Sequence, residues 1–143
     1  MANTWIVAAD ASRARVLQVA GPKRLVEVDN LLNPEGRLQN REVNTDAAGR
    51  FSGPDRPGGH SSGDENRTMD HQDERFAKRL GDYLDKARTE HRYDELVLVA
   101  PPRFLGMIRK ELGKEVEKLV AGQVPKDLSW FNQRELENYL SAP

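Results

Sequence analysis

Two glycines and a histidine, Gly58-Gly59-His60, stand together in the most polar part of this 143-residue chain. Glycine has no Cβ, so a backbone with two successive glycines can approach a ligand closely. Histidine titrates near neutral pH and can donate a hydrogen bond or act as a base. A loop with this tip is therefore suited to placing a polar group against a reacting bond. Isolated short motifs have high false-positive rates, so a solvated linker is the alternative interpretation.

The motif belongs to a long polar segment that we place at about residues 34–72. The segment holds six of the chain's eleven glycines and few large apolar side chains. Such a composition cannot bury enough apolar surface to offset the entropy of ordering the chain. A loop of this length inside one domain is uncommon, and it is usually functional or disordered. The sequence thus predicts a flexible insert.

Composition and charge restrict the function classes. The 22 basic and 23 acidic residues give a formal net charge of −1, so we expect no bulk electrostatic binding to DNA or to a membrane, while a local basic patch remains open. The chain has no cysteine and therefore no thiol chemistry. No signal peptide and no apolar run of membrane-spanning length are evident. These features predict a cytoplasmic protein with a single domain.

Apolar periodicity predicts the elements on either side of the insert. Three strands are expected at about residues 5–9, 13–19 and 25–32, and the tight turns between them predict an antiparallel meander. After the insert, helical periodicity is expected from Asp70. The apolar positions between Phe76 and Ala87 form one helix face, with Leu80 at its centre.

The last third of the chain predicts a second unit of the same sheet. Leu96–Ala100 is a continuous apolar run, typical of a central strand covered on both faces. A helix that starts at Pro101-Pro102 and ends at Gly122 should follow, with a possible break at Gly113. An edge strand is then expected over Val124–Trp130. Asn132 and Glu135 have the spacing of a capping box for a last helix. The order β-β-β-insert-α-β-α-β-α predicts an α/β fold with a mixed sheet, in which the meander is joined to a βαβ unit.

Other catalytic arrangements are less well supported by the spacing. Ser61 and Ser62 beside His60 do not provide the geometry of a Ser-His-Asp hydrolase. A metal site would need residues on regular elements at ligand spacing. The possible metal ligands near the motif do not meet this condition, so we expect no metal and no cofactor. These residues are His60, Asp64, Glu65, Asp70 and His71.

Charged residues outside the motif have simpler interpretations. Asp10 follows the first strand and is interpreted as a turn former. Arg13 and Arg15 lie on the second strand and are interpreted as part of a solvated face. Within the insert, Arg56 and Arg67 are spaced so that they could contact phosphates.

Four segments together carry a resemblance to a known family: Trp5–Arg15, Phe76–Leu80, Ala100–Gly106 and Lys126–Leu128. The chain resembles the bacterial family of proteins required for attachment to host cells. That family is in turn similar to the middle domain of archaeal and eukaryotic class I peptide-release factors. In those domains a Gly-Gly-Gln loop enters the ribosomal peptidyl-transferase centre. The resemblance implies a ribonuclease H-like fold.

The resemblance also implies a site. Gly58-Gly59-His60 takes the place of the Gly-Gly-Gln loop, and Arg56, Ser61 and Arg67 would contact RNA. The implied partner is the ribosome or tRNA, and the implied reaction is hydrolysis of a peptidyl-tRNA ester. His60 differs from the glutamine of release factors, and the chain has no room for their codon-reading domains. The alternative hypothesis is a non-enzymatic interaction or regulatory protein with an indirect role in attachment.

Overall fold

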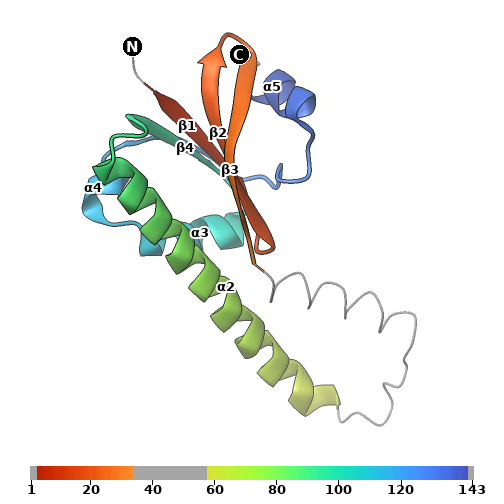
Figure 1. Cartoon of the computed structure of the whole chain (residues 1–143). Helices are drawn as coiled ribbons and strands as arrows, with labels where there is room; N and C mark the ends of the chain where they lie inside the picture. Colours follow the sequence, from red (N-terminus) through yellow and green to blue (C-terminus); the bar gives the residue numbers. More distant parts are fainter. Residues whose placement is uncertain (1–2, 34–57, 142–143) are drawn as a thin grey trace.

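The computed structural model describes residues 3–33 and 58–141, and for residues 58–70 and Ser141 it describes the backbone alone. Within these ranges the chain forms a five-stranded sheet in the order β3-β2-β1-β4-β5. Helices lie on both faces of the sheet (Figure 1). The sequence predicted a flexible insert at about residues 34–72. Residues 34–57, with Arg56, lie outside the described residues, whereas residues 58–72 belong to a helix.

The sheet is mixed, as the sequence predicted. Strands β1 (Thr4–Ala9), β2 (Arg13–Gly21) and β3 (Arg24–Leu32) form the antiparallel meander. Strands β4 (Glu95–Val99) and β5 (Val120–Val124) continue the sheet from β1 in parallel orientation. β1 and β4 are therefore central, and both are continuous apolar runs because helices cover them on either face.

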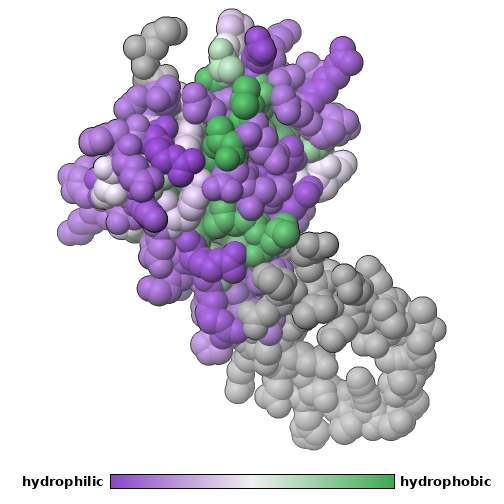
Figure 2. Space-filling model, viewed as in Figure 1, coloured by the Kyte–Doolittle hydropathy of each residue, from purple (hydrophilic) through white to green (hydrophobic). Residues whose placement is uncertain are grey.

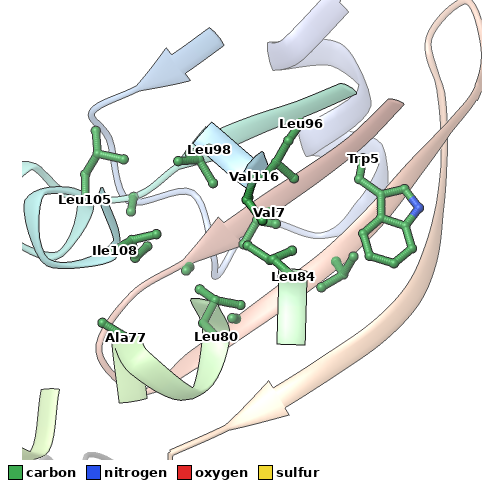
Figure 3. Close-up of a cluster of buried hydrophobic side chains, with 14 of the residues drawn as sticks. Trp5, Val7, Ala77, Leu80, Leu84, Leu96, Leu98, Leu105, Ile108 and Val116 are labelled. Atoms are coloured by element: carbon green, nitrogen blue, oxygen red, sulfur yellow. The ribbon is translucent and has the colours of Figure 1, made fainter. Parts of the chain in front are cut away.

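The larger core lies between the sheet and two helices, α2 (Gly58–Thr89) and α3 (Pro102–Glu111). Figure 3 shows Leu80 and Leu84 of α2 directed toward Val7 of the sheet. The exposed fraction of each of these three side chains is 0%. Other members of the same core are Trp5, Phe76, Leu96, Leu98, Ile108 and Val116.

A smaller core lies on the opposite face of the sheet, beneath α5 (Gln133–Ser141). Leu136 of α5 is fully buried there. The helix begins with the capping box that the sequence predicted. The backbone N–H of Glu135 donates to Asn132 Oδ1 at 2.8 Å, and the backbone N–H of Asn132 donates to Glu135 Oε1 at 2.8 Å. This cap satisfies two helix-terminal donors and fixes the point where α5 starts.

Helix α2 is longer than the sequence predicted. It spans 32 residues and begins at Gly58 rather than near Asp70. The Gly-Gly-His motif accordingly lies in a first helical turn and not in a loop. The apolar periodicity that marks the helix starts only at Phe76, and glycines are poor helix formers. A helix that continues past its packed region leaves no periodic signal in the sequence.

The segment after β4 also differs from expectation. The break that the sequence indicated at Gly113 is present, since α3 ends at Glu111 and Gly113 precedes a single turn, α4 (Lys114–Glu117). The helical segment ends at Glu117, however, and not at Gly122. The edge strand β5 then occupies Val120–Val124 rather than Val124–Trp130. Val120 lies four residues after Val116, a spacing that also fits a helix face. Periodicity therefore could not distinguish a helix from a strand at Val120.

Replacement of Leu80 by alanine tests the main core. Because Leu80 is fully buried between α2 and the sheet, Leu80→Ala should lower the free energy of unfolding by about 2–5 kcal/mol. Lys78→Ala, at an exposed position of the same helix, is the control and should change it by less than about 0.5 kcal/mol. Urea denaturation measures both, and equal midpoints for the two variants would show that the helix face is assigned wrongly.

Candidate functional site

The Gly-Gly-His motif lies at the end of α2 that extends away from the sheet (Figure 1). Asp73 is the first buried residue of α2 among those whose side chains are described. At a rise of about 1.5 Å per residue, Gly58 is about 22 Å along the helix axis from Asp73. Ser61 and Arg67 lie on the same projecting part. We call residues 58–72 of α2 the arm.

The arm begins where α2 is fixed to the start of α3. Asp73 Oδ2 forms an ion pair with Arg103 Nη1 at 2.9 Å, and the Asp73 side chain is only 9% exposed. One turn further, the rings of Phe76 and Phe104 stack with their centroids 5.9 Å apart. A poorly solvated carboxylate needs its charged partner, so this pair ties the position of α2 to that of α3.

The side of α2 that faces β3 is fixed as well. Arg79 Nη2 donates to the carbonyl oxygen of Leu32 at 2.6 Å. One turn later, the Tyr83 hydroxyl donates to Asp29 Oδ2 at 2.7 Å. Burial and this carboxylate raise the pKa of Tyr83 from 10.0 to about 12. These contacts prevent α2 from rotating about its own axis relative to the sheet.

Helices α2 and α3 lie close together at Gly81. A Cβ placed on Gly81 would lie 2.8 Å from the carbonyl oxygen of Glu111. Real Cβ atoms do not come so close to a backbone oxygen, so glycine is required for this contact. The arm therefore projects from a part of α2 that is held by the core on the sheet, by α3 and by the edge strand β3.

A second polar cluster lies at the carboxyl end of β1, where ligands often bind in open α/β sheets. Asp10 Oδ1 accepts from the backbone N–H groups of Ser12 at 2.7 Å and Arg13 at 3.0 Å. The buried Ser129 hydroxyl lies 3.0 Å from Asp10 Oδ2 and 2.8 Å from Asp127 Oδ1. Asp10 is thus the turn former that the sequence predicted, and it also binds the loop before α5.

Arg15 is not part of a solvated face, contrary to the sequence-based interpretation. Its exposed fraction is 7%, and its guanidinium donates to the carbonyl oxygens of Ser129 and Phe131 and to Glu27. Arg13 also donates to the carbonyl oxygen of Ser129. The partners are backbone groups distant in sequence, which no local pattern could indicate. The two arginines join β2 to the loop that precedes α5.

These contacts identify the cluster as structural. A cavity of about 320 Å³ beside it is lined by Asp10, Ser12, Arg13 and Leu32. The carboxylate of Asp10 and the guanidinium of Arg13 are occupied by protein partners.

Among the residues that the structure describes, no group of three or more histidines and carboxylates is placed to hold a metal ion. In the same part of the chain, no helix combines the length and apolar character needed to cross a membrane.

Comparison with known proteins gives the family. A family model described as "Protein required for attachment to host cells" matches residues 5–140. The chain belongs to this family. The matched residues include every described strand, apart from Thr4 at the start of β1, and all of α5 except Ser141.

A relative in Rickettsia prowazekii (strain Madrid E), "Uncharacterized protein RP470", is 34% identical over 62 residues. The aligned region covers 42% of this chain and 41% of the Rickettsia protein. The chain thus spans about two fifths of that relative's length. The similarity identifies a homologue over this region and carries no activity with it.

Substitution of Arg15 tests the structural interpretation of the cluster. Lysine keeps the charge but lacks the planar fork that reaches several acceptors at once. Arg15→Lys should therefore lower the free energy of unfolding by about 1–3 kcal/mol, because buried carbonyl groups lose their donors. Arg24→Lys, at an exposed position of β3, is the matched control. Identical denaturation curves for the two variants would contradict the assigned contacts.

Alkaline titration tests the contact between Tyr83 and Asp29. Because the pKa of Tyr83 is raised from 10.0 to about 12 in the folded protein, its contribution is complete below pH 10 and is lost as pH rises toward 12. Unfolding free energies measured across this range should fall less steeply for Tyr83→Phe than for the unmodified chain. Parallel curves would show that Tyr83 ionises normally and that the contact with Asp29 does not persist.

Proposed function

We propose that this member of the host-attachment family engages the ribosome or tRNA in the cytoplasm through Gly58-Gly59-His60. The observation that carries the proposal is the position of this motif. It lies at the first turn of a 32-residue helix, about 22 Å along the axis from the first buried side chain that is described. A helix about 10–12 Å wide is a slender and stiff support for a motif that must reach into a confined site.

The proposal includes a ribonuclease H-like fold related to the middle domain of class I release factors. What supports it is the mixed sheet, with an antiparallel hairpin on one side of β1 and parallel strands on the other. The order of elements supports it too, since the motif comes after the meander and opens the long helix. The segments quoted above for the resemblance include Phe76 and Phe104, which join α2 to α3.

The first turn of a helix offers a specific chemistry. Its backbone N–H groups have no intrahelical acceptors, and the helix dipole makes this end attractive to anions. Gly58 and Gly59 would let a phosphate or an ester oxygen approach those donors without steric hindrance. His60 would orient a water molecule or accept its proton. Arg56, Ser61 and Arg67 would contact the RNA on either side of the motif.

Two substitutions in the motif test the proposal. Gly59→Ala should reduce peptidyl-tRNA hydrolysis about 100-fold, because a displacement of about 1 Å at a reacting group has an effect of this size. It should leave stability unchanged or raise it by up to about 1 kcal/mol, since alanine favours a helix. His60→Gln restores the residue that release factors have, and it should retain or increase activity.

Ribosome co-sedimentation from cell lysate accompanies the activity assay, with Lys114→Ala on the distant α4 as the control. The unmodified chain, His60→Gln and Lys114→Ala should all sediment with ribosomes. The proposal fails if the unmodified chain shows neither ribosome association nor hydrolysis. It also fails if Gly59→Ala behaves like the control in both assays.

A second candidate is a non-enzymatic interaction or regulatory protein that affects attachment indirectly. The description of the matching family, "Protein required for attachment to host cells", favours it. Under this hypothesis Gly59→Ala and His60→Gln leave every interaction unchanged. Affinity capture with and without ribonuclease separates the two candidates, since RNA-dependent partners belong to the first.

A further inference from the structure

One side of α2 presents exposed basic residues in line with the arm. The contacts of Arg79 with Leu32 and of Tyr83 with Asp29 identify the side that faces β3. Residues four before and seven after Arg79 lie on the same side, because these spacings complete about one and two helical turns. They are Arg75 and Lys86, and all three basic residues are exposed.

The guanidinium groups on this side lie over aromatic rings. Arg79 Cζ is 5.2 Å from the centre of the Phe76 ring. Beyond the end of α2, Arg92 Cζ is 5.0 Å from the centre of a Trp5 ring and 5.9 Å from that of Tyr83. A guanidinium held against a ring loses less conformational freedom when it binds an anion. The bond from Arg79 to Leu32 involves one of the five N–H donors of that group.

The opposite side of α2 is electrically balanced. The contact of Gly81 with Glu111 identifies it as the side facing α3. It carries Glu74, Lys78 and Asp85, and Arg88 pairs with Asp85 at 3.0 Å. On the side facing β3, α2 carries three basic residues and the acidic residue Asp82. Beyond its end, Glu90 and Arg92 add one charge of each sign, and Asp29 of β3 adds a negative charge beside Tyr83. The positive excess is therefore local to one side of the helix, although the chain as a whole has a formal net charge of −1.

We propose that Arg75, Arg79 and Lys86, continued by Arg92, form a phosphate-binding stripe for single-stranded RNA. The inference rests on the proposed function, because it gives the RNA a path from the Gly-Gly-His motif back toward the sheet. From Arg75 to Lys86 the stripe runs about 16 Å along the helix axis. Figure 2 shows the face that carries α2 and β3, with hydrophilic residues over the helix and hydrophobic groups along the strand. Asp82, within the stripe, should weaken the binding.

Fluorescence anisotropy with a labelled single-stranded RNA of about 12 nucleotides tests the stripe directly. Each phosphate contact contributes a slope of about 0.7 to the plot of log affinity against log salt for single strands. Arg75→Gln with Arg79→Gln should weaken binding about tenfold at low salt and reduce the slope by about 1.4. Asp82→Asn should strengthen binding several-fold, because it removes a repulsive charge.

Matched controls separate the stripe from net charge and from folding. Lys110→Gln with Lys114→Gln removes two positive charges from α3 and α4 and should leave affinity and slope nearly unchanged. Arg75→Lys with Arg79→Lys keeps the charges and should retain the slope. Equal losses for the two glutamine pairs would overturn the inference, as would an unchanged affinity of Asp82→Asn. Tighter binding of a single-stranded DNA of the same sequence would also overturn it.

The outcome is independent of the test of the proposed function. If the isolated RNA binds through the stripe while the chain does not associate with ribosomes, the stripe stands and the proposed function fails. If the chain hydrolyses peptidyl-tRNA while the glutamine pair in α2 has no effect on RNA affinity, the proposed function stands and the stripe is wrong.

Discussion

The burial of one apolar face of α2 against β1 and β4 determines the rest of the structure. Phe76, Leu80 and Leu84 lie on this face, and each is essentially inaccessible to solvent. Side chains of this size contribute about 1.5–3 kcal/mol each when they are fully buried. This face belongs to the second half of α2, so the packed half fixes the direction in which the first half extends. The Gly81 contact and the Asp73–Arg103 pair set the same direction from the side of α3.

This arrangement separates stability from function along a single helix. The polar groups near the sheet serve the fold: Asp10, Arg15 and Ser129 join β1 and β2 to the loop before α5. The chemically versatile residues lie at the other end of α2, away from these contacts. Substitutions in the motif are consequently expected to alter activity without altering the core. A site on a rigid helix is also held more accurately than a site on a loop.

The sequence predicted those features that depend on local patterns. The meander, the central strand near Leu96–Val99, the buried Leu80 and the capping box of Asn132 and Glu135 are all confirmed. The prediction was wrong where tertiary contacts decide the outcome. The first part of β5 was predicted to be helical because Val116 and Val120 fit both periods, and only its pairing with β4 distinguishes a strand from a helix there. Arg15 was read as exposed because its carbonyl partners are distant in sequence.

The candidate site was predicted in part. The motif and its place before the long helix came from the sequence, whereas its position in the first turn of α2 did not. Composition predicted a loop there because two glycines disfavour a helix. The helix in this region also lacks the apolar face from which a helix is predicted. The sequence left a local basic patch open but did not place it on α2, since a near-zero net charge says nothing about where a local excess lies.

Photocrosslinking from position 60 tests the central claim most directly. The chain contains no cysteine, so His60→Cys accepts a photoactivatable label at one defined site at the end of the arm. The proposal predicts that crosslinks on ribosomes map to the acceptor end of tRNA and to nearby ribosomal RNA, while a label at Lys114→Cys does not reach them. Crosslinks from position 60 that match those from position 114, or that reach no RNA, would contradict the claim.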